Sequence, residues 1–159
     1  MRRFAVVLVA VVVGVVGAGL TSVAAANNIV DEETIVVGEH STKFRILDLF
    51  GKPDDFKVGD RYLFRSELTD EADAVVGHAN NECAVQFAKR DTCSVTYELE
   101  PRGTIVAQGD VPVSQLGPGG TWTYAILGGT GEFENVRGSV VVEVVGDGPD
   151  TEHSLHLLP

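Results

Sequence analysis

The segment Gly128–Gly138 reads Gly-Gly-Thr-Gly-Glu-Phe-Glu-Asn-Val-Arg-Gly and decides the fold. Glycine adopts positive φ without steric cost, so the glycines at its start let the backbone turn tightly. Thr121–Leu127 before it and Ser139–Val145 after it are rich in strand-forming residues. A phosphate-binding loop would need a helix or a Gly-Lys-Ser/Thr ending directly after the glycines, and the sequence has neither. The segment therefore predicts a turn between two strands.

The rest of the chain repeats this pattern of short strand-like runs separated by turn residues. In Thr42–Phe50, alternate residues share one face, among them Phe44, Asp48 and Phe50. After the first residues of the chain, apolar side chains nowhere recur at helical spacing. Further strands are predicted at 60–68, around Cys83, around Cys93, and at 104–109, 121–127, 139–145 and 151–158. Eight short sequential strands favour an all-β, antiparallel up-and-down barrel, with a β-sandwich as the alternative.

The N-terminus has the pattern of an export signal. Met1–Ala26 begins with two arginines, continues with an apolar run and ends in three alanines, which suits signal peptidase. A membrane anchor is the competing interpretation, but the apolar run is short for a span. We therefore predict a cleaved signal peptide at 1–26, a flexible acidic lead-in at 27–40 and a single barrel domain at 41–159, in an exported, extracellular protein.

The charge of the chain excludes several partners. The formal net charge is −11, from 12 Lys and Arg against 23 Asp and Glu. Nucleic acids and anionic lipids are bound by clustered cations that release counterions, and this chain lacks such clusters. We therefore expect no nucleic-acid partner, and no membrane association after signal cleavage.

The two cysteines are predicted to form a disulfide. An oxidising compartment allows such a bridge to persist. Cys83 and Cys93 are symmetric about Ala88 in the turn between two predicted strands, so they can face each other across a hairpin if the loop has an odd number of residues. The sequence alone leaves open the pairing register of the two strands that hold these cysteines.

Residues along most of the chain resemble the allene oxide cyclase and dirigent barrel superfamily. The most specific part is the glycine-rich turn, read as Gly-Gly-Thr-Gly-x-Phe-x-x-x-Arg-Gly. The other matching residues, in order, are Gly59-Asp60, Phe64, Leu68-Thr69-Asp70, Gly77, Cys83, Gln108-Gly109 and Ala125-Ile126-Leu127. The resemblance implies an eight-stranded barrel, often trimeric, whose apolar cavity steers cyclisation or coupling of a small hydrophobic intermediate without a cofactor. A homo-oligomer, dimer or trimer, is accordingly expected.

The resemblance also indicates site residues. The first-strand acid of the family corresponds to Asp48, which we predict as the catalytic group, because a carboxylate inside an apolar barrel can exchange a proton or face a developing cation. Phe50, Ser66 and Val111 stand where the cyclase has asparagine, asparagine and tyrosine. The predicted cavity residues are Phe50, Ser66, Tyr97 and Tyr124, and the structural turn residues are Gly128, Gly129, Gly131 and Arg137.

Several other side chains have a structural interpretation. His153 and His156 are three residues apart, so in a strand they point to opposite faces and cannot share an ion; we expect surface or barrel-end histidines and no metal. Arg137 is expected to pair with Glu132 or Glu134, or with a carboxylate on a strand, and so to lock the turn. Trp122 and Tyr124 share a face and either fill the core or line the cavity, with the core favoured.

Three functions remain open from the sequence. The barrel could be a cyclase or isomerase, a lipocalin-like carrier of a small molecule, or a structural exported protein. Inward aromatic residues would decide between them, because together they could fill a small barrel and leave no cavity. Those residues are Phe44, Phe50, Phe64, Phe87, Tyr97 and Trp122.

Overall fold

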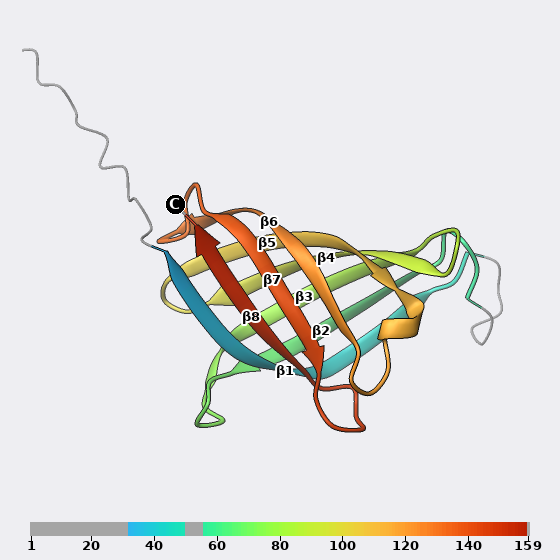
Figure 1. The fold of residues 1–159 in the computed structure, drawn as a ribbon, viewed down its shortest axis with the longest axis horizontal. Coiled ribbons are helices and arrows are strands. Elements are labelled where there is room, and N and C mark those ends of the chain that lie inside the picture. Colours follow the sequence, from blue (N-terminus) through green and yellow to red (C-terminus); the bar gives the residue numbers. More distant parts are fainter. Residues whose placement is uncertain (1–31, 50–55, 159) are drawn as a thin grey trace, which may run out of the picture.

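A computed structural model describes residues 32–49 and 56–158, and these residues form a closed antiparallel barrel of eight strands (Figure 1). Each strand pairs with the next along the chain, and β1 pairs with β8 to close the wall. Closure leaves no strand edge exposed. The strands are β1 (Glu33–Leu47), β2 (Arg61–Thr69), β3 (Val75–Val85), β4 (Arg90–Leu99), β5 (Gly103–Pro112), β6 (Thr121–Gly131), β7 (Arg137–Val144) and β8 (Thr151–Leu158), with a 3₁₀ turn η1 (Val113–Gln115) after β5. The predicted barrel is therefore confirmed.

The first strand begins earlier than the sequence suggested. The expected lead-in at 27–40 overlaps β1, which starts at Glu33 and pairs with β8 from Glu33↔Leu157 to Glu39↔Thr151. From residue 33 onward, the lead-in is therefore part of the barrel wall. The predicted signal peptide at 1–26 lies outside the described residues. Across residues 32–49 and 56–158, no helix has the length and apolarity needed to cross a bilayer.

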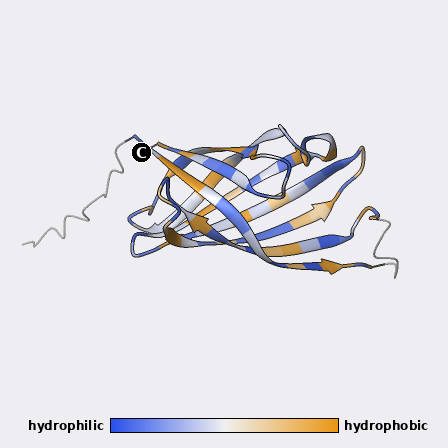
Figure 2. Ribbon diagram, turned by 90° about the horizontal axis from the view of Figure 1, so that it is seen from below, coloured by the Kyte–Doolittle hydropathy of each residue, from blue (hydrophilic) through white to orange (hydrophobic). Residues whose placement is uncertain are grey.

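A bulge in β1 changes which residues face inward. The pairing with β2 shifts between Ser41↔Ser66 and Lys43↔Arg65, which leaves Thr42 as the extra residue. Odd-numbered residues such as Glu39 therefore point inward before the bulge. After it, the even-numbered Phe44 lines the interior. Elsewhere, hydrophobic and hydrophilic residues alternate along the strands, as Figure 2 shows.

The two ends of the barrel differ. The β2–β3, β4–β5 and β6–β7 turns lie at the end where β1 begins and β8 finishes, on the left in Figure 1. This end is filled by side chains that are fully shielded from solvent, among them Leu68, Ile105, Phe133, Val136 and Leu157. The other end carries the β3–β4 turn and η1 and leads into a cavity.

The glycine-rich turn seals the filled end. A Cβ at Gly129 would lie 2.4 Å from the Thr104 carbonyl oxygen, so only glycine allows this close approach of strands β5 and β6. Phe133 is fully buried, and the guanidinium of Arg102 lies 4.7 Å from its ring centroid. The turn therefore works as a plug for the barrel.

The ion pairs of this turn differ from the prediction. Arg102, rather than Arg137, binds Glu132, at 2.8 Å, and it also binds Glu33 of β1, at 2.7 Å. Arg137 instead donates to the backbone carbonyl of Val136. The expected Arg137 pair is wrong because its side chain turns back to the main chain.

The disulfide forms across the β3–β4 hairpin. Cys83 and Cys93 are directly opposite each other, with their Cα atoms 4.1 Å apart. The last pair before the turn is Val85↔Asp91, so the enclosed loop has an odd number of residues, as the symmetry about Ala88 requires. Both cysteines are buried and lie on the cavity wall.

Candidate functional site

The open half of the barrel encloses a cavity of about 920 Å³. This volume lies within the usual range for small-molecule sites. Side chains of seven strands and of the loops at the open end form its lining, which is mostly apolar with a few polar groups. The barrel is therefore not filled by its aromatic residues. The deepest polar groups are Glu39, Ser66, Asn81 and His153; the walls and rim include Phe44, Phe56, Tyr62, Phe64, Phe87, Asp91, Trp122 and Tyr124.

A carboxylate–imidazole pair lies at the floor of the cavity. Glu39 Oε2 is 2.7 Å from His153 Nε2, and the Asn81 amide donates to Glu39 Oε1 at 2.7 Å. The other imidazole nitrogen, Nδ1, lies 2.8 Å from the Tyr97 hydroxyl. Glu39 and His153 are 4% and 3% exposed. Strands β1, β3, β4 and β8 thus meet in one buried polar network.

The neighbouring polar groups keep the Glu39 carboxyl ionised. Burial raises the pKa of its carboxyl, but the hydrogen bond and charge of His153, together with the polar contacts of Ser66 and Asn81, outweigh burial and leave the pKa below its ordinary value. Burial raises the pKa of Tyr97 well above its ordinary value, and the nearby Glu39 charge adds to this effect. Tyr97 therefore stays protonated. When the imidazole is neutral, the Tyr97 hydroxyl donates to Nδ1, which favours the tautomer with a proton on Nε2, facing Glu39.

Two hydroxyls complete the floor. Thr151 Oγ1 lies 2.8 Å from His153 Nε2 and helps to fix the ring. The Ser66 side chain is fully buried beside the Glu39 carboxylate and helps to lower the pKa of that group, but its Oγ makes no hydrogen bond of good geometry within the described chain. Since buried hydroxyls are normally satisfied, Ser66 is suited to bind a polar group of a ligand.

A second carboxylate lies nearer the open end. Asp91 is 4% exposed and accepts a hydrogen bond of 2.7 Å from the Tyr62 hydroxyl at Oδ2. Its other oxygen, Oδ1, has no hydrogen-bond partner among the described residues. Burial raises the pKa of Asp91; the Tyr62 hydrogen bond opposes this effect, and the charge of Asp110 adds to it.

Aromatic rings form the walls between these polar groups. Tyr62 stacks on Phe64 with ring centroids 6.3 Å apart, and Phe56 meets Tyr62 edge to face at 6.0 Å. On β6, Trp122 and Tyr124 also meet edge to face, at 6.4 Å. Both β6 rings line the cavity and also belong to or pack against the buried core, so the two alternatives hold together.

The structure brings together some of the predicted site residues. Ser66 and Tyr124 line the cavity, while Tyr97 lies behind His153. Asp48 is half-buried just after the end of β1, next to Leu49, and is not among the lining residues. Phe50 lies outside the described residues. The catalytic role of Asp48 stays a prediction.

Several site residues were missed from the sequence. Glu39 was assigned to the lead-in, and His153 was expected at the surface or the barrel end. His153 in fact points inward and His156 outward, so the prediction of opposite faces holds. Asn81 carried no sequence signal of a site, and Asp91 was assigned to the polar turn that follows Ala88. Within residues 32–49 and 56–158, no three His, Cys, Asp or Glu side chains gather as a metal site would require.

The chain belongs to a known barrel family. Residues 42–155 match the model of the allene oxide cyclase barrel like domain, which covers most of the chain. The protein is therefore a member of the allene oxide cyclase-like barrel family. A search of curated proteins finds no match.

Solved structures share this fold. A pyocyanin demethylase has 29% sequence identity and a TM-score of 0.65, with 79% of this chain and 99% of that chain covered. An exo-specific intermolecular Diels-Alderase has 20% identity and a TM-score of 0.64, over 79% of this chain and 98% of that one. A pterocarpan synthase dirigent protein has 15% identity and a TM-score of 0.60, over 81% and 89%. At these lower identities, the last two show a common fold only.

Proposed function

We propose that this protein is an exported enzyme that binds a small, mostly hydrophobic molecule inside the barrel and directs its isomerisation or cyclisation with the chain's own side chains. The observation that carries this proposal is the ionised Glu39, held by His153 and Asn81 at the floor of an apolar cavity of about 920 Å³. A carboxylate–imidazole pair is costly to bury unless it is well satisfied. Its place at the base of an open cavity favours a chemical role.

The geometry suits proton transfer. Isomerisation requires a proton to leave one atom and return to another, and Glu39 can accept it and give it back. His153, fixed by Tyr97 and Thr151, keeps the carboxylate in place. Ser66 is suited to hold a polar atom of the ligand near Glu39.

The geometry also suits cyclisation. Rigid aromatic walls can hold a flexible molecule in its reactive conformation, which removes an entropic barrier. The fixed negative charge of Glu39 can then stabilise positive charge that develops on the ligand.

The comparisons support a small-molecule role. The name of the neighbour at 29% sequence identity, a pyocyanin demethylase, describes an enzyme that acts on a small molecule. Export is supported by the Cys83–Cys93 disulfide, because such bridges persist in oxidising compartments. The signal-like sequence of residues 1–26 also supports export.

The test has two steps. Native mass spectrometry of the protein purified from its source identifies a retained small molecule. The turnover of that molecule is then measured for the wild type, Glu39→Gln and Asp48→Asn, while its affinity is measured from the fluorescence of Trp122, the only tryptophan of the chain. Glu39→Gln should lower turnover by about 100-fold or more and change the dissociation constant only a few-fold.

The two acid variants separate the alternatives. Loss of turnover in Asp48→Asn, with full activity in Glu39→Gln, would make Asp48 the catalytic acid and Glu39 a structural group. The absence of turnover in the wild type, together with tight binding, would indicate the alternative, a non-catalytic lipocalin-like carrier.

A further inference from the structure

The polar groups of the cavity lie at two depths. Asn81 of β3 contacts Glu39 at the floor, whereas Val85 of the same strand is paired with Asp91 at the start of the hairpin turn. Four residues separate these levels, which corresponds to about 13 Å along the strand at about 3.3 Å per residue. Asp91 is therefore a second polar group on the cavity wall, between the open end and Glu39.

Only one of the two carboxylate oxygens of Asp91 has a hydrogen-bond partner among the described residues. Tyr62 donates to Oδ2, but Oδ1 has no hydrogen-bond partner among the described residues, although the side chain is 4% exposed. Leaving a buried charged acceptor without a partner is costly, and the cost is larger than for a neutral group. A residue kept in this state at a cavity wall is suited to a partner that arrives from outside the chain.

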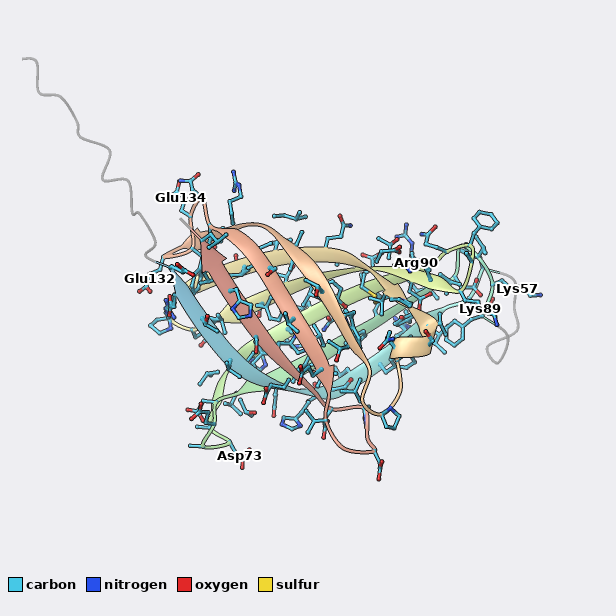
Figure 3. The ribbon with its side chains drawn as sticks, viewed as in Figure 1. Lys57, Asp73, Lys89, Arg90, Glu132 and Glu134 are labelled. Carbon is cyan, nitrogen blue, oxygen red and sulfur yellow. A yellow bond between two sulfur atoms is a disulfide. The ribbon has the colours of Figure 1, made fainter. Side chains whose placement is uncertain are left out.

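Among residues 32–49 and 56–158, the surroundings of Asp91 contain no buried cation. Lys89, which is exposed on the β3–β4 turn, is the one Lys or Arg that these residues contribute to the cavity lining. Figure 3 shows Lys57, Lys89 and Arg90 together at the open end, and Arg90 binds Asp110. Solvent screens the charge of an exposed lysine, whereas the field of buried Asp91 acts inside the cavity at a lower dielectric.

Aromatic faces surround the same space. Among the described residues, seven Phe, Tyr and Trp side chains line the cavity. Aromatic faces attract organic cations, and the attraction grows when the cation loses its hydration shell. A carboxylate within an aromatic enclosure is a combination that recognises a positive charge spread over an organic group.

We infer that the ligand of this cavity is an organic cation, an N-alkylated heteroaromatic or quaternary ammonium compound, whose positive charge lies beside Asp91 while its far end reaches Ser66 and Glu39. The inference rests on the proposed function and specifies its substrate class. The distance between the level of Asp91 and the level of Glu39 suits a molecule of two or three fused rings. Two acidic groups on the walls disfavour a ligand with a carboxylate of its own.

Three probes of the same ring system test the charge. Isothermal titration calorimetry at a mildly alkaline pH compares N-methylacridinium (a cation), acridine (neutral) and acridine-9-carboxylate (an anion). N-methylacridinium should bind about tenfold more tightly than acridine, and the carboxylate should bind most weakly. Equal binding of cation and neutral probe by the wild type would overturn the inference, whatever the variants do.

Two variants test which carboxylate causes the preference for the cationic probe. Asp91→Asn should reduce the ratio of the two affinities several-fold, to the smaller preference that the aromatic walls and Glu39 provide, because the amide keeps the shape and removes the charge. Glu143→Gln removes one exposed carboxylate on β7 and should leave the ratio unchanged. An unchanged ratio in a folded Asp91→Asn protein would contradict the placement of the charge.

The outcome also separates this inference from the proposed function. If acridine and N-methylacridinium bind equally well, the cavity takes small apolar molecules and only the cation assignment fails. If no probe binds and the purified protein retains no small molecule, both fail.

Discussion

The Tyr97 hydroxyl lies 2.8 Å from His153 Nδ1, and the two rings meet edge to face with centroids 5.6 Å apart. Tyr97 is on β4 and His153 on β8, on different parts of the barrel wall, and the second imidazole nitrogen faces Glu39 of β1. The contact therefore sets the orientation and the tautomer of the ring that holds the proposed catalytic carboxylate.

Tyr97→Phe should lower kcat by about tenfold while KM stays nearly constant. The phenyl ring keeps the packing, but Nδ1 loses its donor, so the tautomer that places a proton on Nε2 is no longer favoured. Steady-state kinetics as a function of pH check this role. A purely structural tyrosine would leave the shape of the pH profile unchanged, and that result would remove Tyr97 from the proposed network.

Glu39 should contribute to stability in a pH-dependent way. The pKa of its carboxyl is lower in the folded protein than in the unfolded chain, so the ionised form stabilises the fold above the unfolded pKa of about 4.3, and this contribution is lost as pH falls through the folded pKa. Urea denaturation of the wild type and Glu39→Gln at several pH values should show a constant difference in the free energy of unfolding near neutral pH. The difference should shrink in acid. A difference that is independent of pH down to strongly acidic solution would contradict the pKa direction.

Removal of the disulfide should destabilise the barrel by about 2.5 to 3 kcal/mol. Cys83 and Cys93 are separated by 10 residues, and in the chain-entropy model a short loop of this size gives that stabilisation. Urea denaturation of the Cys83→Ala/Cys93→Ala double variant, compared with the oxidised wild type, measures the loss. Reduced wild-type protein is the control, and equal stability in all three samples would show that the bridge does not constrain the unfolded chain.

Phe133→Ala should be among the most damaging single substitutions in the turn. Phe133 is fully buried at the sealed end, so its removal leaves a cavity at a cost of about 3 to 5 kcal/mol. Phe87→Ala makes the same chemical change at the open end, where the side chain is 77% exposed, and should cost less than about 0.5 kcal/mol. Thermal and urea denaturation of the two variants compare them directly; similar losses would contradict the assignment of Phe133 as the plug.

Local features of the barrel could be predicted from the sequence. The glycine-rich turn, the strand runs and the symmetry of Cys83 and Cys93 about Ala88 depend on neighbouring residues, so the hairpins were predicted in the right places. These segments lie within residues 42–155, which match the barrel family.

The site depends on contacts between distant parts of the chain. Glu39 faces inward because β1 pairs with β8, more than a hundred residues away in sequence, and because the bulge at Thr42 reverses the inward positions that follow it. A polar residue among inward positions also breaks the alternation that identifies a strand. His153 could be placed opposite His156, but only the register with β1 and β7 determines which of them faces inward.

Among the described residues, Phe133 and Val136 close one end of the barrel. A molecule that has reached Glu39 leaves toward the other end, past the rim at Phe44 and Phe87. A product as large as its precursor would leave the cavity slowly, so product release rather than the chemical step would limit the rate of repeated turnover. Such an enzyme would show a rapid first turnover followed by a slower steady rate, whichever small molecule it uses.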